Sequence, residues 1–345
     1  MDFRTTSTES NTPPALSVAE LEYQVEGWIY DGQARQQSPE TTRNRRHVTA
    51  KLLWFLRHRE FTHCGLREIR AFFAYLNTGH EEAAGRWGEN NVEGLSGRAR
   101  TRAEQPMKAT TVRYYYTYLR ALFNWIVAEG VLAESPMARL AAPIAREDQI
   151  EPFSREEMYA LLDAAERGAY PRRDVALIRF LYDTGVRSAE LCGIVLADLD
   201  IHTQRVTIRG KGHKDRAVYY GMETRRALWA LLGPGGHRLP GSSPLFPVLR
   251  GPTEGQPFTR NGLLHLLRAI GKRAGVPNCH PHRFRHSFAV HFLTNGGNQF
   301  SLSHLLGHSN LTMTQKYIKL AQADLEDQHR RFSPGDDLKP SQRRK

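Results

Sequence analysis

The chain has 345 residues, of which 40% are hydrophobic, and it carries 48 Lys and Arg against 36 Asp and Glu. This length is sufficient for two domains that each bury a core of their own. The three cysteines, Cys64, Cys192 and Cys279, form no CxxC pair, which excludes a disulfide framework and a cysteine zinc site.

The positive charge is unevenly distributed along the chain. The formal net charge is +12; residues 151–345 hold 29 basic and 18 acidic side chains, whereas residues 1–150 hold 19 and 18. Such an excess of cations in one half favours a polyanionic partner. No apolar run is long enough to span a bilayer and no apolar leader opens the chain, so we expect a cytoplasmic protein without membrane contact.

The first half of the chain is predicted to be an all-α domain over residues 17–140. Residues 1–16 are rich in Ser, Thr and Pro and are expected to form a disordered tail. Apolar residues three and four positions apart then predict four helical segments, the first of them after an N-cap at Ser17. These segments span residues 16–30, 47–59, 66–76 and 110–130. The polar, Gly-rich stretch 78–108 is too long for a simple connection and is interpreted as an insertion.

The second half is predicted to be an α+β domain over residues 153–333, after a linker at 141–152 and before a basic tail at 334–345. Ser154 and Glu157 form a capping box, and an apolar helical segment ends at Gly185. Residues 205–210 and 216–221 alternate like the two strands of a β-hairpin, and further helical segments follow. The fold is therefore predicted to be mostly α, with one small antiparallel sheet in the second domain.

Six polar residues follow one another in the second half, within five short motifs. The motifs are TGVRSAEL, RGKGHKDR, PHRFRH, LLGHSN and TQKY. The six candidate catalytic residues are Arg187, Lys211, His282, Arg285, His308 and Tyr317. Cationic groups around a phenol suit phosphate chemistry: a free phenol titrates near pH 10 and needs assistance to act as a nucleophile. Attack on a phosphodiester would store the bond energy in a phosphotyrosyl ester, so that the reverse reaction needs neither ATP nor metal.

Each of these residues also has a structural alternative. Arg187 could form an ordinary ion pair with Glu190, and Lys211 could lie in a solvated turn. His282 and Arg285 share one face of a predicted helix and are expected to face a groove, although surface cations would show the same spacing. Histidine pairs at 282/286 and 304/308 admit a metal site, but no HExxH motif or carboxylate partner accompanies them, so none is predicted.

Together the motifs resemble those of the tyrosine recombinases, the lambda integrase family, over residues 153–332. The resemblance implies that Tyr317 is the nucleophile and forms a 3′-phosphotyrosyl intermediate. Arg187, Arg285 and His308 would stabilise the transition state, His282 would assist proton transfer, and Lys211 would act as general acid. It further implies a clamp around duplex DNA, strand exchange through a Holliday junction, and no cofactor.

The resemblance also carries expectations about partners. We expect a homotetramer on synapsed recombination sites that is mostly monomeric when free, with a possible second recombinase or accessory protein. The short segment before the first helix predicts a two-domain, Xer-like layout without an arm-binding domain, acting on DNA of the nucleoid. The residues expected to contact DNA are Arg43, Arg45, Arg46, Lys51, Arg113, Lys214 and Arg216.

Three other functions remain open at this point. A type IB topoisomerase would use similar chemistry to relax supercoils, although a long coiled-coil linker often precedes its tyrosine. A non-catalytic DNA-binding protein descended from a recombinase, or a histidine-metal nuclease, would also fit parts of the sequence.

Overall fold

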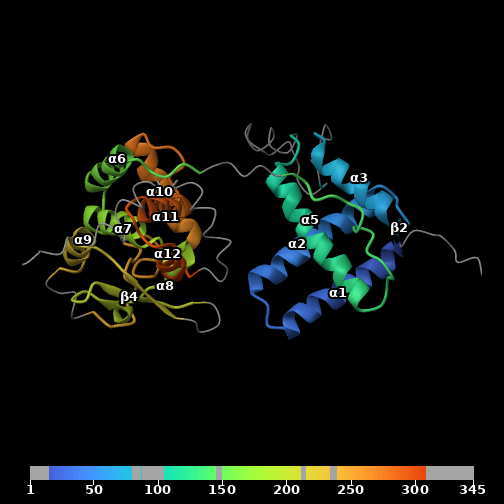
Figure 1. The fold of residues 1–345 in the computed structure, drawn as a ribbon, viewed down its shortest axis with the longest axis horizontal. Helices are drawn as coiled ribbons and strands as arrows, with labels where there is room; N and C mark the ends of the chain where they lie inside the picture. The colour runs from blue at the N-terminus through green and yellow to red at the C-terminus, as the bar shows by residue number, and fades with distance from the viewer. Residues whose placement is uncertain are drawn as a thin grey trace, which may run out of the picture. The chain divides into compact units, whose positions relative to one another are not determined.

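The computed structural model describes residues 15–79, 87, 105–144, 150–210, 215–233 and 239–307. The chain divides into two compact units, Met1–Asp148 and Gln149–Lys345, which are described separately (Figure 1). The predicted tail at 1–16, except for its last two residues, most of the insertion at 78–108, and the basic tail at 334–345 lie outside the described residues.

The first unit contains four helices in its described part, as the apolar spacing predicts. They are α1 (Val18–Ala34), α2 (Pro39–His58), α3 (Leu66–Asn77) and α5 (Ala109–Ala128). Ser17 forms a complete capping box with Glu20 at the start of α1. Helix α2 begins earlier than predicted, because Ser38 caps it and Pro39 occupies its first turn. A two-residue antiparallel pair, β1 (Leu16–Ser17) with β2 (His63–Cys64), was not expected from the sequence.

The core of the first unit is aromatic. Phe55 and Phe72 are fully buried with their ring centroids 5.3 Å apart, an edge-to-face geometry that stabilises such pairs. Trp87, from within the predicted insertion, packs on this core, with its ring 5.6 Å from Trp54 and 6.3 Å from Tyr115. The insertion therefore contributes at least one side chain to the fold.

In its described part, the second unit combines helices with one small sheet. Its helices are α6 (Arg155–Glu166), α7 (Pro171–Thr184), α8 (Ser188–Gly193), α9 (Met222–Leu232), α10 (Arg260–Ala274), α11 (Pro281–Thr294) and α12 (Gln299–Leu306), with a 3-10 turn at Leu196–Asp198. The sheet has the antiparallel order β3 (Leu199–Asp200), β4 (Arg205–Ile208) and β5 (Arg216–Tyr219). The predicted hairpin is β4–β5, in which Ile208 pairs with Arg216. The predicted fold class is confirmed; β3 and α9 were not predicted individually.

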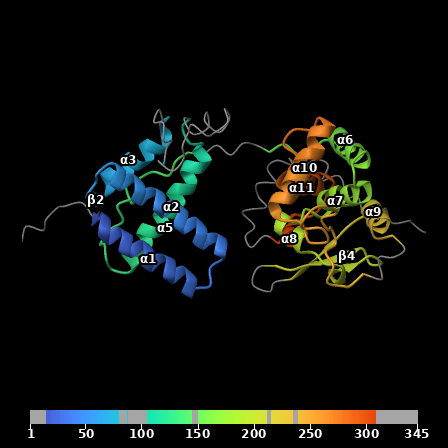
Figure 2. The ribbon, with the colours of Figure 1, turned by 180° about the vertical axis from the view of Figure 1, so that it is seen from behind.

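Local signals define where these elements begin and end. Ser154 and Glu157 form the predicted capping box of α6. Gly185 ends α7 with φ 59°, a left-handed angle that glycine adopts without strain. Phe284 of α11 is fully buried and lies 4.7 Å from Phe153, ring centroid to ring centroid. In Figures 1 and 2, α6, α7, α10 and α11 lie together, with the sheet around β4 to one side of them. None of the described helices is both long and apolar enough to cross a membrane.

Candidate active site

The C-terminal end of α12 is a meeting point for three arginines. The last carbonyls of an α-helix have no partner within the helix and carry its partial negative charge. Here three consecutive carbonyl oxygens accept hydrogen bonds from three guanidinium groups that come from three different elements. The pairs are Leu305 with Arg216 at 2.8 Å, Leu306 with Arg285 at 2.8 Å, and Gly307 with Arg187 at 3.1 Å.

Arg187 is the N-cap residue of α8 and keeps part of its side chain accessible. Its Nη1 donates to Glu190 Oε1 at 2.9 Å, while its backbone N–H donates to Glu190 Oε2 at 2.8 Å. The ion pair that the sequence offered as an alternative is therefore present. The side chain is nevertheless 42% exposed, so that it can still be approached from solvent. Arg187 is thus held in place without being covered.

Arg285 differs from the prediction that it faces a groove together with His282. Its side chain is buried, 5% exposed, and donates from Nη1 to the Gly185 carbonyl at 2.9 Å as well as to Leu306. His282, three residues earlier on α11, is exposed. Arg285 is buried because two carbonyls at helix ends, of α7 and α12, supply acceptors that replace water.

Glu190 joins two of the three arginines. Its carboxylate receives four hydrogen bonds, two from Arg187 and two from Arg216, at 2.8 to 2.9 Å. Burial alone would raise the pKa of Glu190, but the hydrogen bonds and charges of Arg216 and Arg187 lower the pKa to about 2. Glu190 is therefore ionised at neutral and at mildly acidic pH. The sequence showed only its pairing with Arg187; the second partner lies 26 residues away.

Arg216 was predicted to contact DNA, and its position does not agree with that role. Its side chain is 8% exposed and points inward, with Nη1 and Nη2 on Glu190 and Nε on the Leu305 carbonyl. All three guanidinium nitrogens of Arg216 donate within the fold, two of them to a carboxylate, and this favours a structural role over a phosphate contact. We withdraw Arg216 from the predicted DNA contacts.

The remaining candidates of this unit, Lys211, Lys214, His308 and Tyr317, lie outside the described residues. The structure describes residues that flank three of them, Lys211, Lys214 and His308. Lys211 and Lys214 belong to the connection between β4 and β5, and His308 directly follows Gly307 at the end of α12. Among the described residues, no group of three or more His, Cys, Asp and Glu side chains lies close enough together to hold a metal ion.

Arg283 is a structural residue inside the PHRFRH motif that the sequence did not single out. Its guanidinium donates to the carbonyls of Glu151 at 3.0 Å and Pro277 at 2.9 Å, and to Glu157 at 2.7 Å. It also stacks 4.0 Å above the Phe153 ring. The helix that carries His282 and Arg285 is thereby tied to the segment that enters the second unit.

The predicted DNA contacts of the first unit fall into two groups. Arg43, Arg46 and Arg113 are exposed on α2 and α5. Arg45 is buried: its Nη1 donates to the Trp28 carbonyl at 2.6 Å, and its guanidinium lies 4.0 Å over the Trp28 ring. Lys51 is also buried, with its ammonium 5.1 Å from the Trp87 ring centroid. We withdraw Arg45 and Lys51 from the predicted contacts, because both cations are desolvated within the fold.

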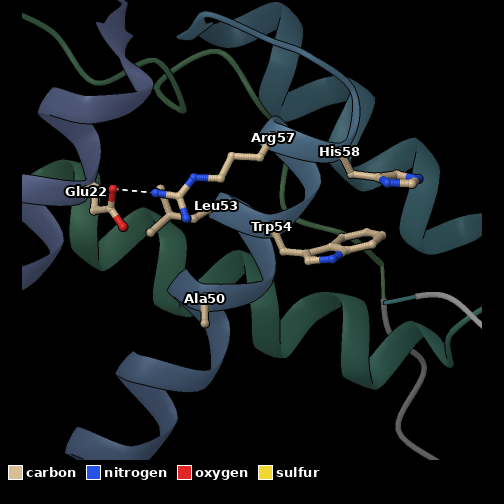
Figure 3. A pocket seen from close by; sticks show the side chains of 6 residues that line it. All are labelled: Glu22, Ala50, Leu53, Trp54, Arg57 and His58. Carbon is tan, nitrogen blue, oxygen red and sulfur yellow. Dashed lines mark hydrogen bonds and ion pairs between the residues drawn. The ribbon is translucent and has the colours of Figure 1, made fainter. Parts of the chain in front are cut away.

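The first unit has a hollow of about 560 Å³ beside α2. Its lining residues are Glu22, Ala50, Leu53, Trp54, Arg57 and His58 (Figure 3). Arg57 forms an ion pair with Glu22, and Trp54 stacks on His58 at 4.5 Å. The hollow contains none of the residues that the motifs single out.

Comparison with known proteins identifies the family of the chain. Residues 152–324, half of the chain, match the phage integrase family. The tyrosine recombinase XerC of Staphylococcus carnosus (strain TM300) is 32% identical over 231 residues, which cover 64% of this chain and 74% of that protein. The tyrosine recombinase XerD of Listeria monocytogenes serotype 4b (strain F2365) is 28% identical over 274 residues, covering 78% and 90%.

The fold is also similar to that of the Tn1549 transposon integrase, solved in complex with circular intermediate DNA. The identity is 17% and the TM-score 0.64, over 91% of this chain and 100% of that chain. The predicted family resemblance is thus confirmed by both sequence and fold. The chain belongs to the phage integrase family and is a tyrosine site-specific recombinase.

Proposed function

We propose that the second unit cleaves one strand of duplex DNA at a recombination site by attack of Tyr317 and later rejoins it to a different strand. The observation that carries this proposal is the convergence of Arg187 and Arg285 on Gly307 and Leu306. Three segments that are far apart in the sequence meet at the point from which the chain continues to His308. A phosphate bound there would lie within reach of both arginines.

The chemistry is a transesterification that needs no cofactor. The Tyr317 oxygen forms a bond to phosphorus, its proton passes to a neighbouring histidine, and the bond from phosphorus to the 5′-oxygen breaks. Lys211 protonates that leaving oxygen. A 3′-phosphotyrosyl ester results, and attack by the 5′-hydroxyl of another strand reverses the step.

Within this mechanism the arginines stabilise the charge that develops on the phosphate. A guanidinium has five N–H donors. The side chain of Arg187 is 42% exposed and donates from Nη1 to Glu190 and from Nη2 to the Gly307 carbonyl. Groups that are fixed before the reaction cost no reorganisation in the transition state, which makes them effective. The hydrogen bonds of Arg187 and Arg285 hold both side chains in place in the protein without DNA.

DNA is the proposed partner, and the cytoplasm with its nucleoid DNA is the proposed place of action. XerH is solved bound to a palindromic difH substrate in a post-cleavage complex; it has 18% identity and a TM-score of 0.59 over 90% of this chain and 84% of that chain. Arg43, Arg46 and Arg113 would contact the phosphate backbone. The proposed assembly is a tetramer on two synapsed sites with a Holliday junction intermediate, formed from free monomers, with a second recombinase or an accessory protein as further partners.

The test is a covalent trapping experiment. A binding site is first selected from the DNA that flanks the gene, and a nicked duplex is then made in which the piece after the cleaved bond diffuses away. The parent is expected to accumulate a DNA-linked species that yields one modified peptide, with DNA on Tyr317. The variant Tyr317→Phe should lose the adduct, whereas Tyr159→Phe, which alters an exposed tyrosine of α6, should keep it.

Attachment of DNA to another residue, or an adduct formed by Tyr317→Phe, would contradict the proposed function. Relaxation of plasmids that lack the selected site, with many turnovers and no joining of two sites, would instead indicate a topoisomerase.

A further inference from the structure

Arg216 occupies a junction between three elements that the proposed reaction needs. It is the first residue of β5, so it closes the hairpin connection that contains Lys211. Its Nε donates to the end of α12, from which the chain enters the segment with His308 and Tyr317. Its Nη1 and Nη2 donate to Glu190 on α8, at 2.9 Å each.

The geometry uses properties that only an arginine has. One edge of the planar guanidinium forms a two-pronged contact with a carboxylate, while Nε reaches a carbonyl in another direction. A lysine has the same charge, but its three N–H donors share one nitrogen, so it cannot reproduce a fork on Glu190 together with a hydrogen bond to Leu305 in another direction. The contact is also closely packed: a Cβ atom built on Gly307 would lie 3.0 to 3.1 Å from the Arg216 guanidinium.

Glu190 transmits this fixation to Arg187. The same carboxylate that is held by Arg216 accepts from the Arg187 side chain and from its backbone N–H. The charged groups around the carboxylate are Arg187 of α8 and Arg216 of β5, while Arg285 of α11 holds the adjoining carbonyl of Leu306. Without Arg216, the carboxylate that holds Arg187 would lose two of its four hydrogen-bond donors.

We propose that Arg216 is a positioning residue for strand cleavage, which holds Glu190, and through it Arg187, against the end of α12. It does not touch the DNA. This inference rests on the proposed function, because Arg187 is taken to bind the phosphate under attack. Arg216 couples three parts of the proposed site: the hairpin whose connection contains Lys211, the side chain of Arg187, and the end of α12, from which the chain continues to Tyr317.

The alternative, a phosphate contact, gives a different experimental signature. Loss of a phosphate contact lowers DNA affinity and reduces the salt dependence of binding by about one counterion. Loss of a positioning residue leaves both unchanged and slows cleavage, since a small displacement of a catalytic group can cost about 100-fold in rate.

The experiment measures binding and single-turnover cleavage for Arg216→Lys on the nicked substrate. Binding is expected within about twofold of the parent with the same salt slope, and cleavage about 100-fold slower. Arg205→Lys is the matched control: it changes an exposed arginine at the other end of the same hairpin, and it should behave like the parent. A parental cleavage rate for Arg216→Lys, or weaker binding with a reduced salt slope, would overturn the inference.

A double-mutant cycle tests the route through Glu190. If Arg216 acts through that carboxylate, the variant with both Arg216→Lys and Glu190→Gln should cleave no more slowly than the slower single variant. Losses that multiply would show independent roles and would overturn the inference. Arg216→Met gives a second test, through the pH dependence of the cleavage rate. Without the two hydrogen bonds from Arg216, Glu190 should bind a proton more easily, and the acid limb of the pH–rate profile should move to higher pH. An unmoved limb would contradict the proposed route.

Adduct formation by the parent, compared with cleavage by Arg216→Lys, separates this inference from the proposed function. If the parent forms no adduct at Tyr317, the function itself is wrong, and the positioning role falls with it. If the parent forms the adduct and Arg216→Lys cleaves at the parental rate, only the positioning role is wrong. Thermal unfolding of each variant, compared with that of Arg205→Lys, identifies a rate loss that follows from misfolding.

Discussion

Arg285 and Gly185 are joined by a 2.9 Å hydrogen bond across 100 residues of sequence. The bond runs from the guanidinium on α11 to the carbonyl that ends α7, just before Arg187. With the second bond to Leu306, it places a buried cation between two helix C-termini, where cations are favoured. A residue proposed to act on phosphate therefore also holds the site together.

Arg285→Ala is expected to affect both rate and stability. The substitution leaves two carbonyls without their donor, and such buried acceptors cost about 2 kcal/mol of unfolding free energy. Cleavage should fall about 100- to 1,000-fold, as when one preorganised donor is removed from a developing anion. Single-turnover cleavage and urea unfolding, measured on the same preparation, check the two effects. Unchanged stability would contradict the structural role.

Gly307→Ala should lower both the stability and the cleavage rate, which is more than the loss of a left-handed glycine alone explains. Gly307 has φ 62°, where alanine costs about 1 kcal/mol; in addition, the new methyl group would press on the Arg216 guanidinium. Gly275→Ala is the matched control, because Gly275 ends α10 with φ 69° and has nothing within 4 Å of its Cβ position. Thermal unfolding should show a loss for both variants, and cleavage assays a loss for Gly307→Ala alone.

Glu190→Gln should reveal a pH-dependent share of the stability. The pKa of Glu190 is lowered from 4.5 to about 2, so the ionised carboxylate stabilises the folded protein by about 3 kcal/mol above pH 4.5. This contribution is lost as the pH falls from 4.5 towards 2, since the unfolded chain binds a proton first. Urea unfolding at pH 7 and pH 3.5 should therefore show a large difference between parent and variant that shrinks in acid. A difference that stays constant would exclude the charge as its cause.

Arg43→Ala and Arg45→Ala, neighbours in sequence on α2, should behave in opposite ways. Arg43 is exposed, so its loss should leave unfolding unchanged, weaken DNA binding and lower the salt slope by about one. Arg45 donates to the Trp28 carbonyl and stacks on its ring, so its loss should cost about 2 kcal/mol of stability. Salt-dependent binding and thermal unfolding of both variants separate these roles. A parental Tm for Arg45→Ala would restore it as a candidate DNA contact.

Much of the secondary structure follows from signals close in sequence. Ser17 with Glu20, and Ser154 with Glu157, mark helix starts, and Gly185 marks a helix end. The strands of the β4–β5 hairpin follow from their β-branched residues. The strand β3 could not be predicted in this way, because a two-residue strand has too little pattern of its own and forms only where β4 offers its edge.

The candidate site was only partly predictable, and Arg216 shows why. In the sequence it is one of several cations in RGKGHKDR, and nothing distinguishes it from a solvent-facing phosphate contact. Burial of a guanidinium requires acceptors on several sides, and those of Arg216 come from residues 26 and 89 positions away. Arg45 was misassigned for the same reason, since its acceptor belongs to the preceding helix.

The amino-acid order alone determined the chemical inventory: the types and succession of the six motif residues, the helix boundaries marked by local capping signals, and the membership of a family. The tertiary structure alone decided which arginines face solvent and which are structural. Arg187, Arg216 and Arg285 are set at one helix end because unpaired carbonyls and the carboxylate of Glu190 collect there. Such acceptors become neighbours only when the chain has folded, and the desolvation of a charge depends on those neighbours and not on the adjacent residues in the sequence.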